Sequence, residues 1–280
     1  MLIGIVADIH DAVDPLKASL SRFRELGVER IVSLGDAFET FKRGDPGAVV
    51  ARLLREHGAV GVWGNHDIGL SHNTSHAIGE MADPSLLEFT RTLSPQLVLD
   101  NCRFSHVEPW LDPTNVWDLW HFNGAPTTIE LANRSFTAVE EQFLFVGHYH
   151  CWAVTSEHEP IDWDGTEAIS LPINGRYLVL VAPVVHGWSA VFNTTTAELT
   201  PVRSPFDERE RPRHYDEKDK VSRGSRETLL YYDLLVVAYL LFPPTKFSIM
   251  LVNSIGNIYL VDSPCPNVLS VSKYCRVMVF

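Results

Sequence analysis

The first ten residues, MLIGIVADIH (Met1–His10), decide the fold class. Apolar residues run without a break from Leu2 to Ala7, which is typical of a parallel strand covered on both faces. Polar Asp8 and His10 follow at the point where that strand would end. Because no basic segment precedes the run and no small-residue cleavage site follows it, it does not resemble a signal peptide. The stretch indicates a buried first strand that ends in a carboxylate and an imidazole.

The strand is the first of several alternating elements. Apolar residues at spacings of three and four predict a helix over residues 13–26, and an Asp-Pro pair at residue 45 predicts the start of another. Apolar runs at residues 31–34 and 59–63 predict the next two strands. Strands that alternate with helices indicate an α/β sheet whose first strands are parallel. Later apolar runs predict strands near residues 102–105 and 143–146 and, as antiparallel pieces, 177–182 and 189–192.

Composition narrows the class of protein. Of the 280 residues, 45% are apolar and 21% are charged, as in ordinary soluble globular proteins, and this length allows one domain with an appendage. Asp and Glu (35) exceed Lys and Arg (23), and the net charge of −12 argues against a broad nucleic-acid-binding surface. The four cysteines occur singly, without a C-x-x-C motif, so we expect reduced thiols and a cytoplasmic protein.

Polar side chains follow five of the predicted strands, and in such sheets ligands bind beyond the carboxyl ends of the strands. We expect the following residues to meet at one edge: Asp8, His10, Asp36, Asn65, His66, His106, His148 and His150. Oxygen donors mixed with imidazoles suit manganese, iron, zinc, nickel or cobalt better than magnesium or calcium. Seven of these eight side chains are too many for one ion. Two ions about 3.5–4 Å apart, sharing one carboxylate and one hydroxide, would use all seven.

The order of these motifs resembles one family. The patterns D-x-H, GD, GNH followed by D or E, a single H, and GHxH occur at residues 8–10, 35–36, 64–67, 106 and 147–150. They resemble the calcineurin-like metallophosphoesterases over roughly residues 1–206. The resemblance implies a four-layer α/β/β/α sandwich. It also implies an enzyme that hydrolyses a small phosphomonoester or phosphodiester at a dinuclear metal centre.

The resemblance also implies roles for single residues. These are the implied metal ligands: Asp8, His10 and His150 for the first ion, Asn65, His106 and His148 for the second, and Asp36 as the bridge. His66 would protonate the leaving oxygen, Asp67 would orient the ring of His66, and a hydroxide shared by the metals would be the nucleophile. The alternative is a metal-binding scaffold of the same fold with weak catalysis, against which the complete ligand set and the intact His66 argue.

Departures from the pattern bear on the substrate. Ala37, Phe38 and Glu39 follow Asp36, and Asp67 rather than glutamate follows His66, which differs from the serine/threonine protein phosphatases of this superfamily. The chain looks more like the small bacterial or archaeal phosphoesterase and phosphodiesterase branch. We expect Glu39 to be solvated. An aromatic stretch at residues 110–122 either walls the substrate pocket or packs as an ordinary helix over the sheet edge.

The C-terminal residues differ in composition from the domain at residues 1–206. Between residues 207 and 227, 14 of 21 residues are charged, which predicts a solvated linker over residues 207–228. Residues 229–280 form an apolar tail, in which the run before Pro243 is shorter than the roughly 20 residues of a membrane-spanning helix. A peripheral membrane anchor, a set of dimerisation strands and translated non-native sequence are the three interpretations. We favour the last, because the tail lacks helical periodicity and caps while the ligand set is complete before it.

Overall fold

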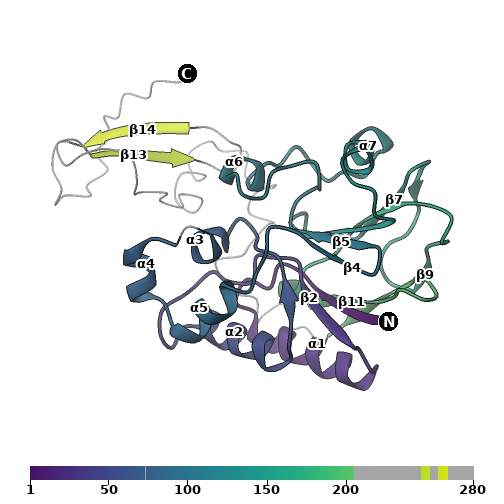
Figure 1. The fold of residues 1–280 in the computed structure, drawn as a ribbon, viewed down its shortest axis with the longest axis horizontal. Helices are drawn as coiled ribbons and strands as arrows, with labels where there is room; N and C mark the ends of the chain where they lie inside the picture. The colour runs from purple at the N-terminus through teal and green to yellow at the C-terminus, as the bar shows by residue number, and fades with distance from the viewer. Residues whose placement is uncertain (73, 205–246, 253–257, 264–280) are drawn as a thin grey trace, which may run out of the picture. The chain divides into compact units, whose positions relative to one another are not determined.

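The computed structural model describes residues 1–72, 74–204, 247–252 and 258–263, and the chain divides into two units, Met1–Pro212 and Arg213–Phe280. The first unit contains two six-stranded sheets (Figure 1). Sheet 1 has the order β3 (Val60–Gly61), β2 (Arg30–Ser33), β1 (Leu2–Val6), β11 (Trp188–Asn193), β12 (Glu198–Arg203) and β9 (Ile169–Ser170). Sheet 2 has the order β4 (Leu97–Leu99), β5 (Cys102–Ser105), β6 (Phe143–Val146), β10 (Tyr177–Leu180), β7 (Ala153–Ser156) and β8 (Pro160–Ile161).

Helices connect and cover the strands. They are α1 (Val13–Glu25), α2 (Pro46–Glu56), α3 (Ile68–Ser71), α4 (His76–Met81), α5 (Pro84–Thr90), α6 (Val116–Leu119), α7 (Ile129–Ala138) and the 3₁₀ turn η1 (Val184–His186). The two helices predicted near the N-terminus are confirmed as α1 and α2. Helix α1 ends just before Gly27, whose φ of +73° suits a helix C-terminus, and Pro46 occupies the first turn of α2.

The strand directions place the strand ends of both sheets in one region. In sheet 1, β1, β2 and β3 run parallel, and β11 is antiparallel to β1. In sheet 2, β5, β6 and β10 run parallel, with Tyr177 opposite Phe143. Strand β10 pairs with β7 antiparallel, as predicted for residues 177–182, whereas the prediction is wrong for its parallel pairing with β6. A long connection runs from β6 to β10 by way of β7, and such a crossover is what parallel pairing requires.

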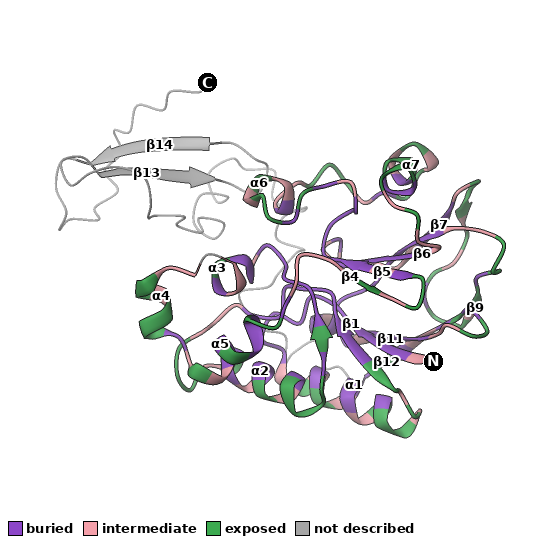
Figure 2. Cartoon of the chain, in the orientation of Figure 1, coloured by how far each residue is buried: buried purple, intermediate pink, exposed green. Residues whose placement is uncertain are grey.

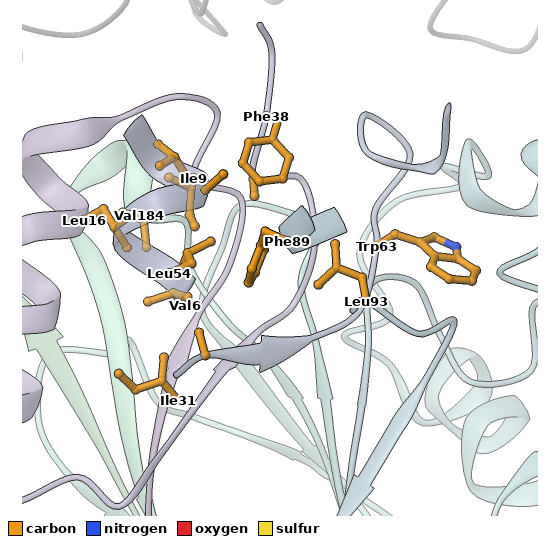
Figure 3. Packing of buried hydrophobic residues seen from close by; sticks show 14 of the residues in the cluster. Val6, Ile9, Leu16, Ile31, Phe38, Leu54, Trp63, Phe89, Leu93 and Val184 are labelled. Carbon is orange, nitrogen blue, oxygen red and sulfur yellow. The ribbon is translucent and has the colours of Figure 1, made fainter. Parts of the chain in front are cut away.

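Three apolar clusters separate four layers, and the strands alternate between clusters as a period of two requires. From β1, Ile3 and Ile5 face a cluster shared with Phe145 of sheet 2, whereas Val6 faces a cluster beneath α1 and α2. Figure 3 shows part of the second of these clusters, including Val6 and Leu16. A third cluster joins sheet 2 to α7. Figure 2 shows the buried strands between exposed helix faces, and the expected α/β/β/α layering is confirmed.

The second unit contains one two-stranded antiparallel sheet among its described residues, β13 (Phe247–Val252) and β14 (Ile258–Ser263). The predicted charged linker at residues 207–228 lies outside the described residues. The same is true of the predicted apolar tail apart from these two strands. In the parts of the chain that the structure describes, none of the helices has the length and apolar character needed to span a bilayer.

Candidate metal centre

The loops that follow β1, β2 and β6 carry most of the predicted ligands in an unusual backbone conformation. Five of these residues have positive φ: Asp8 (49°), His10 (45°), Asp36 (50°), His148 (67°) and His150 (53°). Left-handed backbone is uncommon outside glycine and clusters at functional sites. The amide of Asp8 donates to the Gly35 carbonyl (3.1 Å) and that of His10 to the Asp36 carbonyl (3.0 Å). These hydrogen bonds tie the first two loops together and hold both turns.

Glycines next to the ligands allow the loops to approach one another closely. A Cβ on Gly64 would lie 2.0 Å from Oδ1 of Asp36, and a Cβ on Gly35 would lie 2.6 Å from the Gly64 nitrogen. A Cβ on Gly147 would lie 3.0 Å from Oδ2 of Asp8. Since real Cβ atoms essentially never come closer than about 3 Å, the GD and GNH motifs need glycine before the ligand for steric reasons.

The first group of converging side chains consists of Asp8, His10 and His150. Nε2 of His10 lies 3.3 Å from Nε2 of His150, which lies 3.2 Å from Oδ1 of Asp8. Nδ1 of His10 donates to Oε1 of Glu39 (2.5 Å), which leaves Nε2 of His10 as the acceptor in the neutral ring. The imidazole is therefore held in the tautomer that a metal ligand needs.

The second group consists of Asp36, His106 and His148, together with Asn65. Nδ1 of the fully buried His106 donates to the Leu34 carbonyl (2.8 Å), and Nε2 of His148 donates to the His121 carbonyl (3.2 Å). In neutral rings the remaining nitrogens are acceptors, and they face each other at 3.2 Å. Oδ1 of Asn65 lies 2.8 Å from the His106 nitrogen and 3.0 Å from the His148 nitrogen.

Asp36 lies near both groups, because its Oδ2 is 3.3 Å from Nε2 of His106 and 4.0 Å from Nε2 of His10. Its buried carboxylate would have a raised pKa from desolvation alone, but the neighbouring His106 and His66 hold that pKa well below its usual range. Ring nitrogens and side-chain oxygens from several loops therefore converge around one charged carboxylate. The donor set fits divalent cations of the borderline class, since a cation satisfies acceptors that cannot satisfy one another.

His66 belongs to the site but has a different partner. Its Nδ1 donates to Oε1 of Glu39 (3.1 Å), and its backbone amide donates to Oδ1 of Asp36 (2.9 Å). Burial lowers the pKa of His66, but the charges of Asp36 and Glu39 outweigh burial and raise it to about 9. Sequence reasoning missed this role of Glu39. Its side chain is only 20% exposed and contacts two histidines, so the expectation that it is solvated is wrong.

Asp67 lies beneath the loops rather than beside the ring of His66. Its fully buried carboxylate accepts hydrogen bonds from the amides of Gly64 (3.1 Å), Ala37 (3.1 Å) and Phe38 (3.2 Å). Burial, with the nearby charge of Asp36, raises the pKa of Asp67 to about 7. The expected contact with the His66 ring is made by Glu39 instead, and the position of Asp67 fits a brace between the GD and GNH loops.

A second brace, which the sequence did not single out, holds Glu39 in place. Buried Asp11 accepts hydrogen bonds from the amide of Glu39 (3.1 Å) and from Oγ1 of Thr40 (2.5 Å). The Thr40 hydroxyl in turn accepts from the amide of Gly47 (3.2 Å). The spacing of Asp11, one residue after His10, is the only sequence signal that could have indicated this contact. The Glu39 carboxylate, which orients His10 and His66, is thus anchored to the first turn of α2.

The aromatic stretch after His106 reaches the site at two residues. The ring of Trp120 lies 5.3 Å from that of His66, and the ring of Phe122 lies 5.7 Å from that of His148. Leu119, the last residue of α6, is fully buried in the apolar cluster beneath the helices. The two interpretations of this stretch therefore apply to different residues, because Leu119 packs while Trp120 and Phe122 border the site.

Comparison with known proteins identifies the family. Residues 1–165 match the calcineurin-like phosphoesterase superfamily domain. A metallophosphoesterase from Sphaerobacter thermophilus has a similar structure, with a TM-score of 0.60 and 21% identity over 75% of this chain and 91% of that one. A hypothetical protein from Pyrococcus horikoshii OT3 is also similar, with a TM-score of 0.52 and 14% identity over 74% of this chain and 89% of that one. No curated protein matches the sequence.

The family match covers more than half of the chain and includes every motif from the D-x-H turn to the GHxH loop. At identities this low, the two solved structures support the fold alone, and they agree with the two-sheet architecture. Fold, motif order and family match thus confirm the resemblance seen in the sequence. The chain belongs to the calcineurin-like phosphoesterase superfamily and is a phosphoric ester hydrolase.

Proposed function

We propose that the protein hydrolyses a small phosphomonoester or phosphodiester at a centre that holds two divalent cations. The observation that carries this proposal is the convergence of possible ligand atoms in two groups, with Asp36 of the second group also 4.0 Å from His10 of the first. A single cation contacts at most one group at ordinary ligand distances, whereas two cations satisfy both. Manganese, iron, zinc, nickel and cobalt fit the mixture of imidazole, amide and carboxylate donors, and manganese is our first choice for assay.

The ligand assignment follows from the two groups. Asp8, His10 and His150 would hold one ion and Asn65, His106 and His148 the other, with Asp36 between them. When bound, such ions supply Lewis-acid charge and lower the pKa of water toward neutrality. The chain contributes the fixed tautomers, through the contacts of His10 with Glu39, His106 with Leu34 and His148 with His121.

We assign proton transfer to the leaving oxygen to His66. Its Nδ1 is engaged by Glu39, so Nε2 is the atom that can face a substrate, and the side chain is 23% exposed beside the ligands. General acids need such an orienting partner, because a proton is transferred efficiently only from a fixed atom. Glu39 is accordingly a positioning residue for His66. The braces formed by Asp11 and Asp67 would hold the two loops that present this pair.

We also propose that the protein works in the cytoplasm. The four cysteines occur singly along the sequence, without a C-x-x-C motif. This pattern is typical of proteins that keep their thiols reduced.

The test is turnover of p-nitrophenyl phosphate and bis-p-nitrophenyl phosphate by protein loaded with manganese, nickel, zinc or magnesium in turn. Hydrolysis of either ester, with about two metal ions bound per chain and loss of both properties in Asp36→Asn, supports the proposal. A protein that binds two ions and hydrolyses neither ester is the scaffold alternative. A protein that is active with one ion per chain refutes the dinuclear centre. The ratio of the two turnover rates assigns the monoesterase or diesterase activity.

A further inference from the structure

The aromatic residues beside the ligands are not used by the proposed chemistry, and they are held firmly. Asn115 caps α6 by accepting a hydrogen bond from the Trp117 amide (3.0 Å), and fully buried Leu119 anchors the helix. The amide of Trp120 donates to the Val116 carbonyl (3.0 Å), so Trp120 lies at the end of the helix. The next carbonyl, that of His121, accepts the hydrogen bond from His148 (3.2 Å). Trp120 is therefore fixed relative to the candidate metal ligands.

Trp120 lies on the side of the site from which the leaving group departs. Its ring centre is 5.3 Å from that of His66, and the planes of the two rings are inclined by 42°. An oxygen that accepts a proton from His66 must come within about 3 Å of the donating nitrogen. With its ring centre 5.3 Å from that of His66, the indole is within reach of the substituent on that oxygen. The side chain of Trp120 is partly exposed, so part of the ring remains open to a ligand.

A second aromatic ring lies beside the other ligand group. Phe122 is 56% exposed, although its ring contacts both His148 (5.7 Å) and Tyr149 (5.4 Å between ring centres). A phenyl ring that is held exposed beside a polar centre is unfavourable in free energy, because its apolar surface remains in contact with water. Two aromatic rings thus border the two ligand groups, one next to His66 and one next to His148. A flat apolar group on the substrate would cover such rings.

We propose that Trp120 makes the enzyme selective for phosphoesters whose leaving group carries a planar aromatic ring, which stacks on the indole while His66 protonates the ester oxygen. This inference rests on the proposed function, because it uses His66 to define the leaving-group side. Stacked aromatic pairs are more favourable than contacts of the same area with a saturated ring. Aryl alcohols and nucleosides share this chemistry and differ in the distance of the ring from phosphorus.

The test compares two stable phosphonates with the same carbon skeleton, benzylphosphonate and cyclohexylmethylphosphonate. Each has one substituent, which takes the place of the leaving group, and only the first substituent is planar. Dissociation constants are measured by calorimetry on the full chain loaded with manganese. We expect the wild type to bind benzylphosphonate about two- to tenfold more tightly. A nucleoside 5′-phosphonate forms a third arm of the experiment. If it binds more tightly than benzylphosphonate, the aromatic ring of the preferred leaving group is separated from phosphorus by a sugar.

Variants assign the preference to Trp120. Trp120→Phe keeps a planar ring and is expected to keep the preference, whereas Trp120→Leu is expected to reduce the ratio of dissociation constants to about one. Trp120→Met repeats the second test with a different apolar side chain. Trp117→Leu is the matched control, since Trp117 is 45% exposed on the same short helix. Metal content of each variant shows that the site is intact.

The outcomes separate this inference from the proposed function. Equal binding of the two phosphonates by the wild type, or a preference that persists in Trp120→Leu and Trp120→Met, would overturn the inference. A preference lost equally in Trp117→Leu would overturn the assignment to Trp120. Turnover of p-nitrophenyl esters without any ring preference refutes only the inference. A ring preference without turnover of any ester refutes the proposed hydrolysis and leaves the binding role of Trp120 in place.

Discussion

Replacement of Glu39 by glutamine tests how the chain positions its proposed acid. One carboxylate oxygen, Oε1, accepts hydrogen bonds from Nδ1 of both His10 (2.5 Å) and His66 (3.1 Å). Glutamine has a similar shape but no charge, and it offers an amide donor in place of one acceptor. Hydrogen bonds to charged groups contribute about 1.5–3 kcal/mol and neutral ones about 0.5–1.5 kcal/mol. The expected loss at His66 is therefore about 1–1.5 kcal/mol.

A loss of this size corresponds to about a tenfold decrease in kcat. We expect Glu39→Gln to show that decrease with alkyl esters, whose leaving groups need a proton. The effect on p-nitrophenyl esters should be smaller, because p-nitrophenolate departs unprotonated. Metal content is measured alongside, since Glu39 also orients His10. Glu39→Asp serves as the matched variant, because it keeps the charge but shortens the reach.

A double-mutant cycle gives the decisive comparison. If Glu39 acts through His66, then Glu39→Gln added to His66→Gln should cause no further loss of kcat on alkyl esters. Any effect that remains in that background should appear as weaker metal binding, through His10. Losses on alkyl esters that multiply in the double variant at unchanged metal content would refute the positioning role. They would mean that Glu39 contacts substrate directly.

Three further predictions use the same assays. His66→Gln should keep about two metals per chain and reduce kcat on alkyl esters by roughly 10²–10⁴, with a smaller loss on p-nitrophenyl esters; loss of metal would instead identify His66 as a ligand. Asp36→Asn should lower the occupancy of both metals, whereas His106→Ala should empty mainly one site, and plasma emission spectroscopy distinguishes the two patterns. Chelation should lower Tm by about 10–20 °C, the shift for two ions that are each present at about 100 times Kd in a domain of this size; an unchanged Tm in calorimetry would contradict a site formed by the folded chain.

The sequence predicted which side chains converge at the candidate metal centre, because their positions depend on short-range features. A strand that ends at a known residue fixes where Asp8, Asn65 or His148 will lie, and the carboxyl ends of parallel strands meet. Contacts made by side chains that turn back from a loop could not be read in this way. Glu39 reaches His10 and His66 only because the chain turns at Asp36, whose φ is +50°. Hydrophobic patterning carries no information on such a turn.

Other differences arise from long-range pairing. The residues of β10 are as apolar as those of any other central strand, and their direction follows from the partner that the chain reaches after a long crossover. Asp67 shows the same limit within a motif. Its place after His66 suggested a contact with that ring, whereas three amides of the surrounding loops hold the carboxylate below it. The positions of these backbone amides depend on the fold of both loops, and the spacing of polar residues in the sequence does not predict them.

The backbone conformation of the ligand loops bears on what a cation contributes. Left-handed residues other than glycine cost about 1–3 kcal/mol each, so five of them together approach the roughly 5–15 kcal/mol by which a domain is stable. Hydrogen bonds within the protein must offset much of this cost before any ion binds, and the bonds from Asp8 to Gly35 and from His10 to Asp36 do so. The turns are thus formed by the folded chain itself. Bound cations would add their own binding free energy to the folded state, and for this reason chelation should lower Tm without unfolding the protein at room temperature.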